Sequence, residues 1–179
     1  MIDIAFHPLI TLDKRPLHYF SVLGRALYTA QHLEMNCRAI GGFLNMREQT
    51  TLEGLSGLED PTFQKGITQL WRKTLGNHIH GLIEHGLLPD DIAPIFRLAR
   101  QARNEIAHNV AVDVSERLDL ELDERLDHIL GLVRQIAEAD KVASAIIHLL
   151  NRDPLPNKEI FESYEDRVVT WVMEDTFEE

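Results

Sequence analysis

The segment Arg103-Asn104-Glu105-Ile106-Ala107-His108 combines the residue types best suited to chemistry in this chain. An arginine presents a fixed fork of N–H donors that matches a phosphate and stays charged. A histidine titrates near neutrality and can accept or give a proton, and an asparagine adds a neutral donor and acceptor. These groups suit RNA cleavage in which the ribose 2′-hydroxyl attacks the neighbouring phosphate. A base removes the hydroxyl proton while arginine offsets the charge that builds on the phosphoryl oxygens.

Helical geometry alone does not bring Arg103 and His108 together. The segment lies near the end of a helix expected over about 91–108, in which Arg97, Asn104 and His108 fall within one narrow stripe. Arg103 lies roughly 140° from His108 around an ideal helix. The two side chains could still meet if the helix ends or distorts near His108, if the arginine reaches around the helix, or if a second copy of the chain supplies one of them.

The predicted site has Arg103, His108 and Asn104 as its catalytic residues. Arg97 and Arg100, on the polar side of the same helix, are expected to form a basic rim that binds the substrate. The sequence also permits a purely structural interpretation. In that case Arg103 binds a helix-end carbonyl or a nearby acid, and His108 stabilises the negative end of the helix dipole.

The segment resembles the signature of HEPN domains, the higher eukaryote and prokaryote nucleotide-binding family. Their pattern is an arginine, a polar residue that is often asparagine, a few further residues and then a histidine. Here four residues separate Arg103 from His108. The upstream segments Lys73-Thr74-Leu75-Gly76 and Gly86-Leu87-Leu88-Pro89 are also similar to the family, and the resemblance covers roughly residues 60–150.

The resemblance implies a helical bundle that forms a homodimer and brings two Arg/His pairs into one cleft. Many catalytic members are ribonucleases in toxin–antitoxin, phage-defence or RNA-processing systems. The implied function is a metal-independent endoribonuclease that acts on RNA without a cofactor. In several toxin branches a tyrosine two residues after the histidine is modified by the antitoxin, whereas Val110 occupies that position here. Because other members keep the fold without known cleavage, the alternative is a non-catalytic module that regulates or scaffolds through a protein partner, an antitoxin among the candidates.

Other groups of reactive residues carry a weaker signal. His80 and Glu84 are four residues apart and share a helical face, as metal ligands can, with His78 and His85 close by. No second ligand pair of the HExxH type accompanies them, so half-buried and exposed helix histidines are expected and no metal is assigned. Cys37, the only cysteine, lies on an apolar helical stripe and is expected in the core.

The composition suits one domain over residues 1–179 with one sizeable core, since 44% of the residues are hydrophobic. No apolar run approaches the ~18 residues that a membrane-spanning helix needs. The N-terminus does not resemble a signal peptide, so a cytoplasmic protein without a membrane partner is expected.

The net charge of −11 excludes a general nucleic-acid coating protein, because such proteins neutralise phosphates with excess basic residues. Any contact with RNA must use a local basic site or a basic partner.

Apolar residues recur at alternating spacings of three and four, which predicts an all-α, HEPN-like bundle. Five main helices are expected, over about 17–47, 61–85, 91–108 and 122–150 and after a cap at Asn157. Residues 48–61 resemble a loop, and residues 110–122 at most a minor hairpin.

Several single residues carry further expectations about these helices. Gly86 can end the second helix in a left-handed conformation. Gly66, Gly76 and Gly81 mark places where another helix can pass close. Trp71 and Trp171, both on apolar stripes, are expected in the core or in an interface.

Overall fold

The computed structural model describes residues 14–53, 61–110 and 122–174, and within these ranges all regular structure is helical. The elements in chain order are α2 (Lys14–Glu53), α3 (Pro61–Arg72), α4 (Leu75–Glu84), α5 (Ala93–Glu105), the π-helical turn η1 (Ile106–Val110), α6 (Leu122–Asn151), α7 (Lys158–Glu162) and α8 (Tyr164–Met173). The predicted all-α fold is confirmed. The hairpin expected over 110–122 falls almost entirely on residues 111–121, outside the described residues. None of the described helices is long and apolar enough to cross a membrane.

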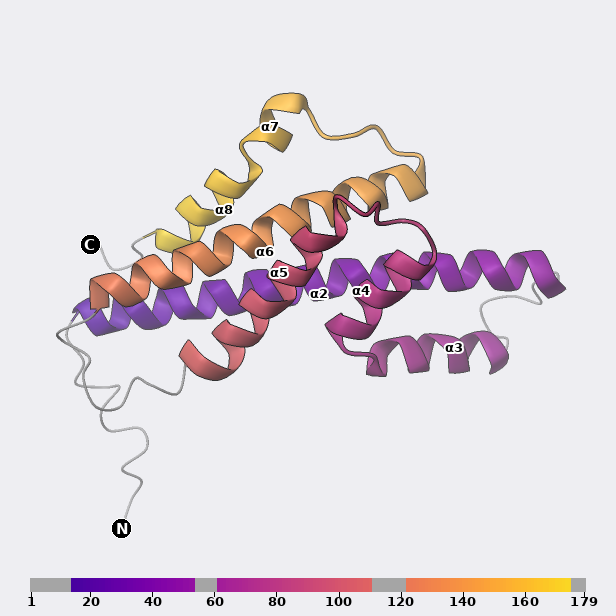
Figure 1. Cartoon of the computed structure of the whole chain (residues 1–179), viewed down its shortest axis with the longest axis horizontal. Helices are drawn as coiled ribbons and strands as arrows, with labels where there is room; N and C mark the ends of the chain where they lie inside the picture. The colour runs from indigo at the N-terminus through magenta and orange to yellow at the C-terminus, as the bar shows by residue number, and fades with distance from the viewer. Residues whose placement is uncertain (1–13, 54–60, 111–121, 175–179) are drawn as a thin grey trace, which may run out of the picture.

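The two longest helices, α2 and α6, form the centre of the bundle. They lie side by side and run in the same direction (Figure 1). Helix α5 packs against α6, and the turn η1 that follows it also contacts α2. Helix α8 packs against α6 on the side of the C-terminus. Helices α3 and α4 both pack on α2, and α4 also contacts α5.

The core follows the apolar periodicity of the sequence. On α2 the buried residues recur every three or four positions and include Val22, Ala26, Leu33, Cys37 and Ile40. The predicted core position of Cys37 is confirmed, since it is 0% exposed. Burial raises the pKa of its thiol to about 12, so the sulfur stays protonated at neutral pH and is no nucleophile.

Two of the predicted helices are each divided by a capping residue. Thr74, in an extended conformation with φ −74° and ψ 160°, separates α3 from α4, and its side chain accepts a hydrogen bond from the backbone N–H of Asn77. Ser163, with φ −90° and ψ 3°, separates α7 from α8 without a side-chain hydrogen bond to the first turn of α8. The five main helices expected therefore appear as seven α-helices in the described residues, because two of the five are divided. The prediction of a loop from residue 48 was wrong, because α2 continues to Glu53.

The end of α4 is as predicted. Gly86 has φ +67°, the left-handed conformation that suits glycine. Its backbone N–H donates to the carbonyl of Ile83 at 2.9 Å, and the N–H of Leu87 donates to the carbonyl of Leu82 at 3.0 Å. These two bonds satisfy carbonyls at the helix end and turn the chain toward α5.

A buried carboxylate joins three helices. Asp140 of α6 is 1% exposed and accepts hydrogen bonds from Asn36 Nδ2 at 2.8 Å, from His32 Nδ1 at 3.1 Å and from the Tyr164 hydroxyl. Asn36 and His32 belong to α2, and Tyr164 begins α8. The hydrogen bond to Asp140 raises the pKa of His32, and burial together with Asp140 raises the pKa of Tyr164. The carboxylate is thus the polar link between α2, α6 and α8.

Candidate anion-binding site

A pocket of about 510 Å³ lies beside the end of α5 and brings together the three predicted catalytic residues. Arg103, Asn104 and His108 all line it, as does Arg100. The other lining residues come from α2, α3, the link after α3 and the first turn of α4; they are Glu34, Arg38, Trp71, Arg72, Lys73, Thr74, Leu75 and Gly76. We call this space the cationic pocket.

The name reflects the charges of the lining residues. Five permanently basic side chains line the pocket against the single carboxylate of Glu34; the basic residues are Arg38, Arg72, Lys73, Arg100 and Arg103. The whole chain, in contrast, has a formal net charge of −11. Because nearby charges of one sign raise the local concentration of the opposite ion, this part of an acidic protein attracts anions.

Glu34 fixes two of the arginines in place. Its carboxylate accepts from Arg38 Nη2 at 2.5 Å and from Arg103 Nη2 at 3.1 Å. Arg103 also donates from Nη1 to Oδ1 of Asn104 at 3.3 Å. The nearby acid foreseen in the structural interpretation of Arg103 is therefore present. A guanidinium has five N–H donors, so these two contacts leave donors of Arg103 for a ligand.

His108 lies on the pocket because the helix changes its pitch after Glu105. Residues Ile106–Val110 form a π-helical turn, in which hydrogen bonds span five residues instead of four. Each residue then advances by less than the ~100° of an α-helix, so the angle between Arg103 and His108 falls below its ideal value of roughly 140°. Distortion near His108, one of the three routes foreseen, thus brings both residues to one pocket within a single chain.

The first turn of α4 forms the opposite wall of the cationic pocket. Thr74 caps this helix, and the backbone N–H groups of a helix N-terminus favour an anion. Gly76 leaves space for the side chain of Arg100, whose Nη1 lies 3.0 Å from the position that a Cβ at Gly76 would occupy. The predicted close approach is therefore confirmed for Gly76. It was wrong for Gly81, where nothing lies within 4 Å of such a Cβ.

Not every predicted site residue reaches the pocket, and several pocket residues were not predicted. Arg100 lines it, whereas Arg97 is exposed and is not among its lining residues. Arg38 and Arg72 were missed because they lie on other helices. A signal for Arg38 was present, since Glu34 precedes it by four residues, the spacing of an ion pair on a helix.

Two of the histidines considered for a metal site have surroundings that the structure describes. His80 Nε2 lies 3.1 Å from Glu84 Oε1 on an exposed face of α4. His78 is 4% exposed, and burial lowers its pKa. Among the described residues no group of three His, Cys, Asp or Glu side chains is placed to hold a metal ion.

Comparison with known proteins gives no relative, since no family model, no curated protein and no solved structure matches the chain. The resemblance to HEPN domains therefore rests on the motif from Arg103 to His108 and on the two upstream segments.

Proposed function

We propose that this protein is a metal-independent endoribonuclease of HEPN type that holds a phosphate of RNA in the cationic pocket. The observation that carries the proposal is that Arg103, Asn104 and His108 line one pocket with four further basic side chains. A phosphodiester is the anion that this set of groups can both bind and cleave. The arginines supply charge and directed N–H donors, and the imidazole supplies proton transfer near neutral pH.

In the proposed reaction the 2′-hydroxyl oxygen of one nucleotide attacks the adjacent phosphorus. The bond from phosphorus to the 5′-oxygen breaks, which leaves a 2′,3′-cyclic phosphate and a 5′-hydroxyl. His108 accepts the proton of the 2′-hydroxyl, and the departing 5′-oxygen takes a proton from water or from His108 of a second copy. Arg103 stabilises the charge that develops on the phosphoryl oxygens, and Asn104 orients the phosphate.

The purified protein should cleave single-stranded or looped RNA in the presence of EDTA as fast as without it. Arginine provides the charge stabilisation that a metal would otherwise supply, so chelation removes nothing that the reaction needs. The products are expected to end in a 2′,3′-cyclic phosphate, which phosphatase leaves intact until acid opens the ring. The matched substrate control is the same oligonucleotide with 2′-deoxyribose at every position, which lacks the attacking hydroxyl and should stay whole. Cleavage of that DNA strand, or loss of activity in EDTA, would contradict the mechanism.

The protein should be a dimer at micromolar concentration. One imidazole can serve one proton transfer at a time, so a second copy that places its own His108 near the same phosphate would complete the acid–base pair. The spacing of Arg103 and His108 no longer requires a second chain, because η1 brings both to one pocket. The dimer is therefore proposed on the HEPN resemblance and on this chemistry. Light scattering is the direct measurement, and a monomeric mass for an active protein would refute it.

The rival function is a non-catalytic module that acts through protein contacts. The acidic charge of the chain favours it, because a free RNase gains affinity from a basic surface. The two functions predict different behaviour of the purified protein toward RNA. A scaffold should show no RNA cleavage and no RNA binding that depends on Arg100 or Arg103, with the fold and any dimer intact.

A further inference from the structure

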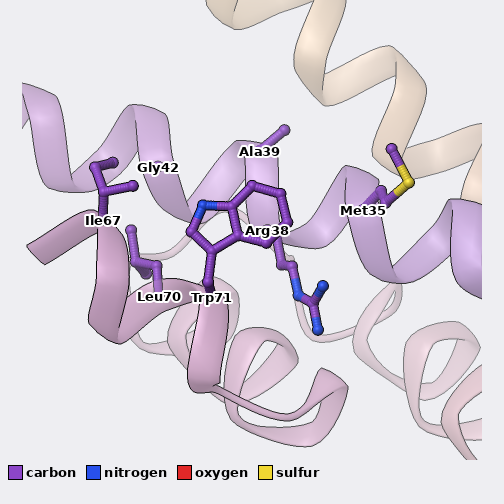
Figure 2. A pocket seen from close by; sticks show the side chains of 7 residues that line it. All are labelled: Met35, Arg38, Ala39, Gly42, Ile67, Leu70 and Trp71. Carbon is purple, nitrogen blue, oxygen red and sulfur yellow. The ribbon is translucent and has the colours of Figure 1, made fainter. Parts of the chain in front are cut away.

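An apolar groove adjoins the cationic pocket. It has a volume of about 290 Å³ and lies between α2 and α3 (Figure 2). Its lining residues are Met35, Arg38, Ala39, Gly42, Ile67, Leu70 and Trp71. Ligand pockets for drug-sized molecules span roughly 300–1,000 Å³, so this groove suits a smaller group such as a single planar ring system.

Trp71 and Arg38 belong to both the groove and the cationic pocket. The guanidinium carbon of Arg38 lies 5.5 Å from the centre of the Trp71 ring, within the range of a cation–π contact. In Figure 2 the indole stands between α3 and α2, with Ile67 and Leu70 on one side of it and the Arg38 guanidinium on the other. The two spaces therefore meet at the cation–π pair of Trp71 and Arg38.

The indole of Trp71 is exposed to an unusual degree for a large aromatic group. It is 61% exposed, and Met35 on the facing helix is 57% exposed. Of the two places expected for Trp71, this exposure excludes the core and leaves an interface. The side chain is thus largely open to solvent, and basic side chains of the cationic pocket lie beside it. Proteins that bind single-stranded nucleic acid combine exposed aromatic rings with basic side chains in this way.

We propose that the groove binds a nucleobase of the RNA strand, stacked on Trp71, while the attached phosphate occupies the cationic pocket. This inference rests on the proposed function, since it assumes that the pocket takes a nucleotide phosphate. A nucleotide pairs one flat apolar ring system with one anion, which matches an apolar groove joined to a cationic pocket. Because every base has a π-face, stacking on Trp71 provides affinity with little dependence on sequence.

The test compares two ligands that differ only in the base, adenosine 5′-monophosphate and ribose 5-phosphate. Neither has a phosphodiester, so binding is measured without cleavage. The chain has two tryptophans, and the Trp171→Phe variant therefore reports Trp71 fluorescence alone. The nucleotide should quench this fluorescence and bind on the order of 10-fold more tightly than the sugar phosphate.

Three variants assign that difference in affinity to the groove. Trp71→Ala should remove most of the 10-fold preference in calorimetry, and Trp71→Phe should restore part of it because it returns a stacking ring. Ala39→Leu should act like Trp71→Ala, since Ala39 lines the groove but not the cationic pocket. Ribose 5-phosphate should bind Ala39→Leu as it binds the unchanged protein.

Each other outcome overturns the inference and says where the error lies. Equal binding of the two ligands would mean that the cationic pocket binds phosphate and that the groove does not bind the base. Binding of neither ligand would remove the proposed function together with this inference. A preference for the nucleotide that survives both Trp71→Ala and Ala39→Leu would place the base elsewhere. Loss of a dimer in Ala39→Leu with the preference unchanged would assign the groove to a second copy.

Discussion

Replacing His108 with alanine should lower the rate of RNA cleavage on the order of 100-fold or more, because general acid–base catalysis contributes about that much. The substitution should leave the fold intact, since the side chain is exposed on η1 and belongs to no core contact. Single-turnover rates with saturating protein separate the chemical step from binding. The matched control is His80→Ala, which removes an exposed histidine paired with Glu84 on α4 and should leave the rate unchanged.

Arg103→Ala should reduce the same rate comparably. A donor that stabilises developing charge on a phosphoryl oxygen contributes on the order of 3 kcal/mol, or about 100-fold. The contact of Arg103 with Glu34 is lost as well, at a cost to stability of about 1 kcal/mol or less for a pair that is partly open to solvent. Arg134→Ala is the control, because its partner Asp166 lies on an exposed surface away from the pocket. Undiminished cleavage by both His108→Ala and Arg103→Ala would mean that the activity belongs to a contaminating nuclease.

Asp140→Ala should destabilise the protein by about 3–5 kcal/mol, the usual effect of removing one partner from a buried charged network. Asn36 and Tyr164 would each lose the acceptor of a hydrogen bond, and the link between α2, α6 and α8 would be broken. Urea unfolding followed by circular dichroism gives the free energy of unfolding directly. Asp166→Ala is the matched control, since that carboxylate is 75% exposed and its ion pair contributes at most about 1 kcal/mol. A change in stability no larger than that of the control would show that the network contributes little.

The pH dependence of stability provides a second readout of the same network. The pKa of His32 is raised in the folded protein by the hydrogen bond to Asp140. Protonation of His32 therefore stabilises the fold fully below its unfolded pKa of about 6.5, and this contribution is lost as the pH rises through the raised folded value. The difference in stability between the wild-type protein and Asp140→Ala should accordingly shrink as the pH rises from below 6.5 through the raised pKa of His32. A difference that stays constant over that range would show that His32 does not titrate against Asp140.

The apolar periodicity predicted which positions of the helices are buried better than it predicted the residues at which the helices end. The apolar stripe of α3 continues in register into α4, with Ile67, Leu70 and Trp71 followed by Leu75 and Ile79. The spacing of apolar residues at intervals of three and four therefore gives no sign of the break between α3 and α4. What breaks the helix is one residue, Thr74, whose extended backbone and side-chain cap restart it in a new direction. The cap is a local hydrogen-bond effect that a count of apolar positions does not contain.

The candidate site could be predicted only in part, because residue types do not give the local pitch of a helix or the packing between helices. Residue types identified Arg103, Asn104 and His108, and the helical angle correctly showed that an ideal helix would not bring Arg103 and His108 together. The sequence offered no measure of pitch, so the π-helical turn at Ile106–Val110 stayed one of three alternatives. Arg38 and Arg72 could not be placed, because their position in the pocket depends on how α2, α3 and α5 are arranged in the fold.

The single carboxylate in the cationic pocket has a consequence for the kinetics of any anion that enters it. Glu34 holds Arg38 and Arg103 in fixed rotamers before a ligand arrives, so less side-chain entropy is lost on binding. The same carboxylate repels the incoming anion and competes with it for both guanidinium groups. Glu34 therefore lowers the affinity for a bound anion, while it keeps the arginine side chains that contact the anion ordered. A pocket built in this way favours short residence times for any anion that enters it.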